Sequence, residues 1–268
     1  MNRAVTIVGF PSDVNSSFLR GPAKAPAAIR AALNSDSSNS FTESGLNLRA
    51  SGVMTDGGDV AISETQADLE VIERRVRDEL EGGASVLGLG GDHSITYPVV
   101  RAYAKRYPDL SIVHIDAHPD LYPIFEGNRF SHACPFARIL EDTSVRTLVQ
   151  IGIRTMNDVQ RAVADRFRVR VFSPSQLQDS WAALPSGPVY VSLDLDGLDP
   201  SFAPGISHRE PGGLTVREVL DVVRRIPGRV VGADVVELNP DEDFRGMTAT
   251  VAAKFVREFI DRIYRDNV

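Results

Sequence analysis

The sequence predicts an α/β fold in which helices cover both faces of a central parallel sheet. Short runs of β-branched and aliphatic residues alternate along the chain with segments of helical periodicity. These strand-like runs are apolar almost throughout, which is typical of parallel strands that are buried on both faces. Because no internal repeat or linker interrupts the alternation, we expect one domain over residues 1–268.

The first third of the chain shows this alternation clearly. Ala4–Phe10 is the first predicted strand. Pro26–Leu33 is a predicted helix, because proline is favoured in the first turn of a helix. The polar stretch Asn34–Gly45 is predicted as a surface loop. The next helix, Thr65–Glu81, has four apolar residues at helical spacing and is expected to end at Gly82.

Strands and helices continue to alternate through the rest of the chain. Thr215 and Glu218 have the spacing of a capping box, so they predict the start of a helix that runs to Ile226. The other predicted strands are Ser85–Leu89, Leu110–Ile115, Leu148–Ile153, Val169–Phe172, Val189–Leu195 and Val230–Val236, and the other helices are Ile95–Arg106 and Thr248–Tyr264.

The composition argues against several classes of function. The net charge of −7 argues against nucleic-acid binding. No apolar run approaches the ~18 residues of a membrane-spanning helix, so no membrane partner is expected. The first residues, MNRAVTIVGF, have neither the apolar core of a signal peptide nor the composition of a transit peptide. With Cys134 as the one cysteine, we expect no disulfide framework and a cytoplasmic location.

Ionisable residues directly follow four of the predicted strands. Open parallel sheets bind ligands outside the carboxyl ends of their strands, so these side chains are expected to line a ligand site. They are His93 in GGDHS, Asp116, His118 and Asp120 in DAHPD, Asp194 and Asp196 in DLDGLDP, and Glu237 in ELNP.

The spacing within two of these motifs predicts a cluster. Residues two apart project from the same face of an extended segment, which would group Asp116, His118 and Asp120, and likewise Asp194 and Asp196. Four carboxylates this close cannot all ionise without a counter-charge, which two divalent cations would supply. Oxygen-rich ligands with two histidines and no thiolate favour Mn²⁺ or a similar ion, and two such ions provide a hydroxide nucleophile near neutral pH.

Each motif taken alone has an ordinary structural explanation. GGDHS fits a turn in which Asp92 caps the next helix, and LDGLDP fits a turn. The metal-site hypothesis is favoured because three such motifs each follow an apolar strand. Two roles are left open for His114, which could be a hydrogen-bond partner of a metal ligand or a histidine buried in the core. Cys134 is expected to be a small buried side chain, and His208, in a Gly- and Pro-rich loop, receives no role.

Together, GGDHS, DAHPD and SLDLDGLDP resemble the three metal-binding signatures of the ureohydrolase family, which includes arginases and agmatinases. The resemblance runs from GPAKAPAAIR to GMTATVAAKFVREF and is closest to plant-type arginases and their bacterial relatives. It implies a three-layer α/β/α fold, a homotrimer or homohexamer, and a small cationic guanidino compound as the substrate.

The resemblance also implies roles for individual residues. Asp116 and Asp194 would bridge two Mn²⁺ ions per subunit, and other first-row divalent ions could replace Mn²⁺. Asp116 is therefore also expected to be a catalytic residue. His132 would act as a proton shuttle, although it could instead cap the following helix. Glu237 would pair with the substrate guanidinium, although it could instead pair with a basic side chain. The implied metal ligands are His93, Asp116, His118, Asp120, Asp194 and Asp196.

The part of the substrate beyond the guanidinium is left open. The loop Leu121–Ser131 differs from the polar loop with which many arginases hold the α-carboxylate. Asn128 and Ser131 are candidate replacements for those contacts, and Asn157 or Asp158 could meet an α-amino group. The aromatic side chains of the same loop could instead pack against an aliphatic amine such as agmatine.

Three functions are therefore compared. The first is Mn²⁺-dependent hydrolysis of a guanidino compound to urea and an amine, with L-arginine favoured over agmatine and other guanidino acids. The second is a dinuclear metallophosphoesterase, which would need a basic phosphate-binding group that is not evident near the motifs. The third is a non-catalytic assembly protein stabilised by metal, which would need no guanidinium partner such as Glu237.

Overall fold

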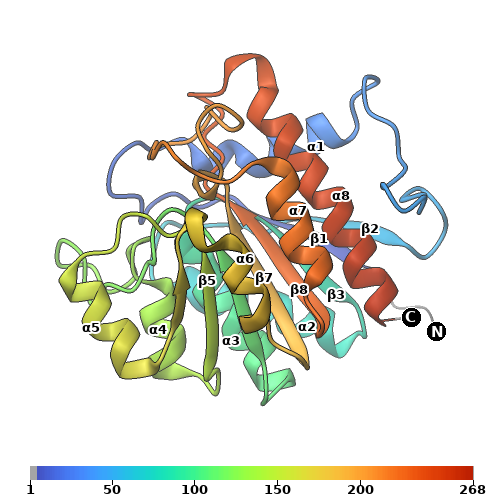
Figure 1. Ribbon diagram of the computed structural model, residues 1–268. Helices are drawn as coiled ribbons and strands as arrows, with labels where there is room; N and C mark the ends of the chain where they lie inside the picture. The colour runs from blue at the N-terminus through green and yellow to red at the C-terminus, as the bar shows by residue number, and fades with distance from the viewer. Residues whose placement is uncertain (1–4, 268) are drawn as a thin grey trace.

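Eight parallel strands form one sheet in the computed structural model, which describes residues 5–267 (Figure 1). Their order across the sheet is β2-β1-β3-β8-β7-β4-β5-β6. The strands are β1 (Val5–Phe10), β2 (Met54–Asp59), β3 (Ser85–Gly90), β4 (Ser111–Ile115), β5 (Thr147–Ile151), β6 (Arg170–Phe172), β7 (Pro188–Asp194) and β8 (Arg229–Val236).

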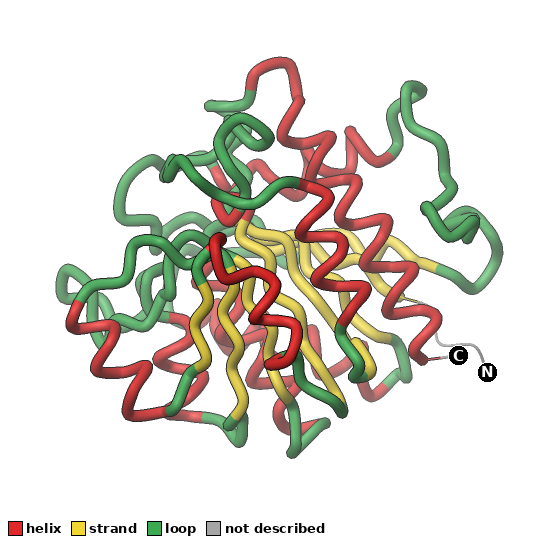
Figure 2. Tube along the Cα trace, in the orientation of Figure 1, coloured by secondary structure: helices red, strands yellow, loops and turns green. Residues whose placement is uncertain are grey.

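Helices cover both faces of the sheet, so the predicted three-layer α/β/α fold class is confirmed. Figure 2 shows the strands lying between two sets of helices. One face carries α1 (Ala25–Leu33), α6 (Leu177–Ser180), α7 (Val216–Arg225) and α8 (Met247–Asn267). The other face carries α2 (Ala67–Glu81), α3 (Thr96–Arg106), α4 (Pro135–Asp142) and α5 (Asp158–Phe167).

Successive strand residues pack into two separate hydrophobic cores. In β1, Ile7 packs with the cluster under α1 and α8, whereas Val8 packs with the cluster under α2 and α3. In β4, Val113 packs in the first of these cores and Ile112 packs in the second. All four side chains are buried. Because both faces of these strands are buried, apolar runs were enough to locate them in the sequence.

Four elements were not predicted from the sequence. Strand β2 lies at the sheet edge, pairs with β1 alone, exposes most of its residues and contains Gly57 and Gly58. It therefore has no hydrophobic pattern. Helices α4, α5 and α6 have eight, ten and four residues, which is too short for a clear periodicity. The ends of the other elements coincide with the prediction or differ from it by at most three residues, and Ala4 lies outside the described residues.

The strand order brings distant parts of the chain together. Strands β3, β8, β7 and β4 are neighbours in the middle of the sheet, and each is followed by one of the four ionisable motifs. The chain passes from β3 to β4 across a gap that β8 and β7 fill later. Ligands of open α/β sheets bind at such a switch in strand order. Within residues 5–267, no helix is long and apolar enough to cross a membrane.

Candidate metal and catalytic site

His93 faces three carboxylates at the carboxyl edge of the sheet. Its Nδ1 atom lies 3.1 Å from Asp120 Oδ2 and 3.2 Å from both Asp116 Oδ2 and Asp194 Oδ2. All four side chains are buried. In the described part of the chain, this buried Nδ1 atom has no hydrogen-bond partner. A nitrogen lone pair among carboxylate oxygens is the arrangement that a shared cation completes.

His118 and Asp196 extend the cluster. His118 Nδ1 lies 2.9 Å from Asp196 Oδ2 and 3.6 Å from Asp116 Oδ1. The ligand atoms of Asp116, His118 and Asp196 all lie within 4.8 Å of one another, which a metal ion could span. Asp116 therefore turns one oxygen towards His93 and the other towards His118, as a bridging carboxylate would.

The electrostatics of this cluster favour a bound cation. Burial, followed by repulsion from Asp196 and Asp116, raises the pKa of Asp194 well above its ordinary value. Burial and repulsion from Asp116 raise the pKa of Asp196 to about 7. Carboxyl groups with raised pKa values keep their protons near neutral pH unless a positive charge replaces them. The donor set therefore fits divalent cations.

Turns, and not extended strands, bring these ligands together. The expectation that residues 116–120 and 194–196 stay extended is wrong. Strand β4 ends before Asp116, Asp120 has a left-handed φ of 50°, and Leu195–Gly197 forms a 3₁₀ turn. The predicted grouping of the side chains is nevertheless present, because both segments turn back over the edge of the sheet.

Gly197 allows the two acidic motifs to touch. A Cβ atom at this position would lie 2.9 Å from Asp116 N and 3.0 Å from Asp116 Cα, which is closer than real Cβ contacts. The neighbouring N–H of Ala117 donates a hydrogen bond of 3.0 Å to Asp196 Oδ1. Backbone contact between the motifs thus sets the position of Asp196 relative to Asp116.

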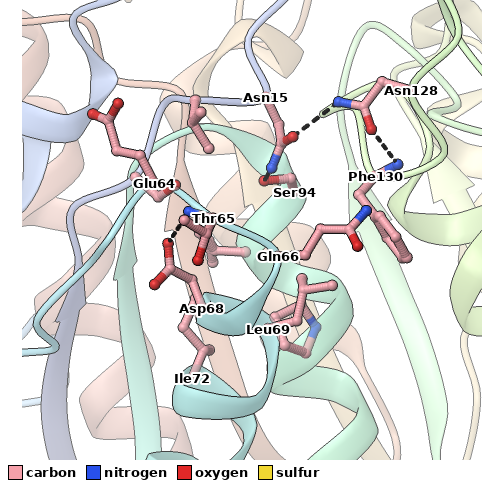
Figure 3. Close-up of a pocket in the computed structure, with 14 residues that line it drawn as sticks. Asn15, Glu64, Thr65, Gln66, Asp68, Leu69, Ile72, Ser94, Asn128 and Phe130 are labelled. Carbon is pink, nitrogen blue, oxygen red and sulfur yellow. Dashed lines mark hydrogen bonds between the residues drawn. The ribbon is translucent and has the colours of Figure 1, made fainter.

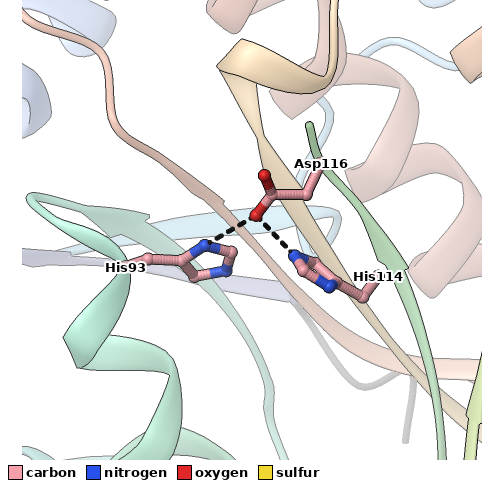
Figure 4. A group of neighbouring side chains, drawn as sticks. All are labelled: His93, His114 and Asp116. Carbon is pink, nitrogen blue, oxygen red and sulfur yellow. Dashed lines mark hydrogen bonds and ion pairs between the residues drawn. The ribbon is translucent and has the colours of Figure 1, made fainter. Parts of the chain in front are cut away.

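His114 holds Asp116 in place (Figure 4). Its Nε2 atom lies 2.7 Å from Asp116 Oδ2, and its Nδ1 atom lies 3.0 Å from the amide nitrogen of Gln150. Because the Gln150 amide nitrogen can only donate, Nδ1 accepts and Nε2 carries the proton that is donated to Asp116. Of the two alternatives left open for His114, the structure shows the contact with a candidate metal ligand.

Ser192 and Asp234 hold His93 from inside the sheet, and sequence reasoning missed both. His93 Nε2 lies 2.9 Å from Ser192 Oγ, which donates a hydrogen bond of 2.7 Å to Asp234 Oδ1. Asp234 Oδ2 also accepts from the hydroxyls of Tyr190 and Thr96. Since the Ser192 proton goes to Asp234, Nε2 of His93 is the protonated nitrogen and Nδ1 is free for a metal. The signal that could have identified Ser192 and Asp234 is that each is a polar residue inside an otherwise apolar strand.

His132 and Glu237 form a pair beside the cluster. Glu237 Oε1 lies 2.8 Å from His132 Nδ1 and accepts the His93 N–H at 2.9 Å. Glu237 has a φ of 65°, which is uncommon for a residue with a side chain and typical of functional sites. Burial lowers the pKa of His132, but Glu237 raises it to about 9. On its other side, His132 Nε2 lies 2.8 Å from Ser17 Oγ.

A pocket of about 210 Å³ opens over the cluster and this pair. Among the described residues that line it there is no lysine or arginine, whereas carboxylates and histidines are frequent. Of the three aromatic residues that the alternative concerns, Tyr122 and Phe125 form part of its wall, whereas Phe130 lines the neighbouring pocket. The lining also includes residues to which the sequence analysis gave no role, namely Ser17, Thr155, Gln160 and His208.

Asn128 lies in a neighbouring pocket and not in this one. Its Nδ2 atom donates to Asn15 Oδ1 at 2.9 Å, and its Oδ1 atom accepts the Phe130 N–H at 2.8 Å (Figure 3). Asn15 in turn donates to Ser94 Oγ at 3.1 Å. The structure therefore uses Asn128 to join two loops, and does not place it against a substrate.

Ser131 and Asp158, the other predicted substrate contacts, also lie away from the pocket lining. Ser131 is buried, and its Oγ atom accepts the Ala133 N–H at 3.3 Å. Asp158 is exposed at the start of α5, where the preceding Asn157 caps the helix through the Gln160 N–H. Helical geometry turns Gln160, two residues after Asp158, towards the pocket instead.

Two further expectations concern residues near the site. Asp92 accepts the Ser94 N–H at 3.0 Å at the start of the 3₁₀ turn that precedes α3, so its capping role is confirmed. Cys134 is fully buried, and burial followed by repulsion from Asp120 raises the pKa of its thiol to about 12. Cys134 is therefore a small buried side chain, as expected from the sequence.

The fold and the site define an α/β protein with a His/Asp cluster that could bind metal and a pocket suited to a cationic ligand. A family model described as "Arginase family" matches residues 3–261. Mitochondrial arginase 1 of Arabidopsis thaliana is 46% identical over 97% of this chain and 81% of its own length. Bacillus anthracis agmatinase is 34% identical over 96% and 90%, respectively.

The solved structure of Medicago truncatula arginase superimposes with a TM-score of 0.92 and 43% identity, covering 98% of this chain and 88% of that one. The chain belongs to the arginase family, as its motifs predicted. It is a hydrolase that acts on amidino C–N bonds.

Proposed function

We propose that this protein hydrolyses L-arginine to L-ornithine and urea with two Mn²⁺ ions per subunit. The observation that carries the proposal is the position of Glu237 beside the acidic cluster, in a pocket whose described lining includes no lysine or arginine. Glu237 is buried and pairs with a basic side chain, His132, as the alternative expected, but this contact uses Oε1 and leaves the second oxygen for a cationic substrate. The 46% identity to a plant arginase supports arginine as that substrate.

Glu237 has one oxygen available for the guanidinium. Its Oε1 atom is held by His132 and by the His93 N–H, whereas Oε2 has no hydrogen-bond donor within residues 5–267. A guanidinium group carries only donors. We therefore assign Oε2 the contact with the guanidinium N–H groups, which would orient the planar cation over the cluster.

His132 is assigned the proton that the leaving amine requires. With a pKa of about 9, its imidazole is protonated near neutral pH. Its Nδ1 atom donates to Glu237, whereas its Nε2 atom accepts the backbone N–H of Ser17 at 3.2 Å and lies 2.8 Å from Ser17 Oγ, at the wall of the pocket. An imidazole that holds a proton at the pocket wall can pass it to the amine as the C–N bond breaks.

The metal ions would be held by the six residues inferred from the sequence. One ion would lie among His93, Asp120 and the bridging pair Asp116 and Asp194, and the other would lie among that pair, His118 and Asp196. When bound, the ions supply a hydroxide nucleophile near neutral pH. The free Nδ1 atom of His93 supports this assignment.

Agmatine is the second candidate substrate. Tyr122 and Phe125 on the pocket wall could pack against its aliphatic chain, and an agmatinase is among the relatives. Arginine is favoured because Gln160, Thr155 and Ser17 offer polar groups for an α-amino acid. Gln160 accepts the Leu121 N–H through Oε1, so its amide nitrogen remains to donate to a carboxylate.

A phosphoesterase function is disfavoured by the same pocket. Phosphate binding generally uses Arg or Lys, and neither type is found among the described lining residues. A non-catalytic role would leave the Glu237–His132 pair without a purpose. We also propose a single domain, a homotrimer or homohexamer and a cytoplasmic location, the last supported by the single buried cysteine.

The test is a parallel assay of urea release. The protein is reconstituted with Mn²⁺ and supplied with L-arginine, agmatine or 4-guanidinobutyrate. We expect the highest kcat/KM for arginine, and Gln160→Leu should reduce this preference over agmatine. Absence of urea from all three compounds contradicts the proposal. A higher kcat/KM for agmatine would establish the alternative substrate instead.

A further inference from the structure

His208 lies on the catalytic pocket without a role in the reaction described so far. Its ring centroid is 5.3 Å from that of His132 and 5.9 Å from that of His118. Phe18 packs against its other side at 5.6 Å between centroids. In the described part of the chain, neither ring nitrogen of His208 has a hydrogen-bond or ion-pair partner, whereas the other four histidines each have one.

We infer that His208 is a substrate-binding residue that accepts a hydrogen bond from the guanidinium group. The inference rests on the proposed function. Its ring lies near both His118, at one end of the acidic cluster, and His132, which is paired with Glu237. A side chain between these two neighbours meets the reacting end of a substrate and not its distal end.

The chemistry of His208 complements that of Glu237. Burial, followed by the nearby His132, lowers the pKa of His208, and neither of its ring nitrogens has a partner within residues 5–267. A neutral imidazole has one acceptor nitrogen and one donor nitrogen. It can accept a guanidinium N–H without repelling the cation. Glu237 and His208 would then bind different N–H groups of one planar ion and limit its rotation.

The alternative is that His208 binds the α-amino acid end of arginine. The two roles differ in which fragments of the substrate His208 would affect. Guanidinium ion has the reacting group alone, whereas L-norvaline has the α-amino acid group and no guanidine. Binding of these two probes to the Mn²⁺-loaded protein therefore separates the roles.

The experiment compares His208→Ala and His208→Gln with wild type. Losing one hydrogen bond to a charged group lowers kcat/KM for arginine by roughly 10- to 100-fold. We expect His208→Ala to weaken guanidinium binding by a similar factor and to change L-norvaline binding less than about twofold. His208→Gln should recover part of the loss, because its amide oxygen can accept a hydrogen bond.

Arg209→Gln is the matched control. Arg209 is the next residue in the same loop, but it is exposed and pairs with Glu242 at 2.7 Å outside the pocket. This control should bind both probes as wild type does. Metal content and melting temperature are measured for every variant, and we expect them to be unchanged, which separates lost binding from lost folding.

Two results would overturn the inference. One is wild-type guanidinium binding by both His208 variants, and the other is selective weakening of L-norvaline binding. Failure of the proposed function gives a different result, namely no urea from the wild-type protein. Because guanidinium binding is measured by calorimetry, the contact at His208 is tested even in that case.

Discussion

Nδ1 of His132 lies 2.8 Å from Oε1 of Glu237, which joins the segment after β4 to the end of β8. The pair links a proton donor to the proposed guanidinium-binding carboxylate. It also makes the stability of the protein depend on pH, because the pKa of His132 is raised from its ordinary 6.5 to about 9 in the folded state.

The first prediction concerns this pH dependence. A histidine with a raised pKa stabilises the fold fully below its unfolded pKa, and the stabilisation is lost as the pH rises through the folded pKa. We compare the unfolding free energies of metal-free wild type and His132→Gln. The advantage of the wild type should be larger near pH 6 than near pH 10, by up to about 3 kcal/mol. Denaturant unfolding between these pH values measures the difference. A difference that is independent of pH would contradict the assignment.

The second prediction concerns metal binding by Asp194. Its carboxylate lies 3.2 Å from His93 Nδ1 and is assigned a bridging position between the ions. Asp194→Ala should lose bound Mn²⁺, measured by elemental analysis, and at least about 100-fold in kcat/KM. The control is Asp158→Asn, which removes an exposed carboxylate outside the pocket and should keep metal and activity. Full metal content in Asp194→Ala would show that Asp194 is not a ligand.

The third prediction concerns His114, which donates to Asp116 Oδ2 at 2.7 Å. His114→Phe keeps an aromatic ring against Phe136, whose centroid lies 3.9 Å away, but removes the donor. Loss of such an outer partner typically reduces metal affinity by about 10- to 100-fold. Competition with a fluorescent chelator measures this affinity. If Mn²⁺ binds His114→Phe as tightly as wild type, the orienting role of His114 is refuted.

The fourth prediction concerns the contact at Gly197. Gly197→Ala would place a Cβ atom 2.9 Å from Asp116 N, so the two acidic motifs must separate. We expect a loss of about 1–3 kcal/mol in unfolding free energy and weaker Mn²⁺ binding. Gly82→Ala is the control, because Gly82 has an ordinary φ of −65° and lies far from the site. Equal effects of both changes would mean that the close approach at Gly197 has no particular importance.

The membership of the site could be largely predicted from the sequence. Candidate ligands such as Asp116 and Asp194 lie in short motifs at the ends of buried strands. Such motifs can be found in the sequence because they involve only a few neighbouring residues. The reason given for their grouping was wrong, however, because Asp120 is left-handed and the 194–196 segment turns. Local alternation cannot describe a segment that leaves the sheet and is held by contacts with another motif.

The substrate loop shows where sequence reasoning fails. Asn128 has the right chemistry for a carboxylate but bonds to Asn15, which lies more than a hundred residues earlier in the chain. His208 had no local signal and yet lies beside His132. Side-chain type decides what a residue can bind, whereas the packing of distant loops decides what it meets.

The sequence by itself determined the layered α/β architecture and the metal-ligand candidates, because hydrophobic runs and acidic motifs are encoded within a few residues. Only the tertiary structure decided the order of the strands, which places β3, β8, β7 and β4 side by side. That order depends on how helices pack over both faces of the sheet. It is the physical reason that four separate motifs meet at one site and that Glu237 meets His132 there.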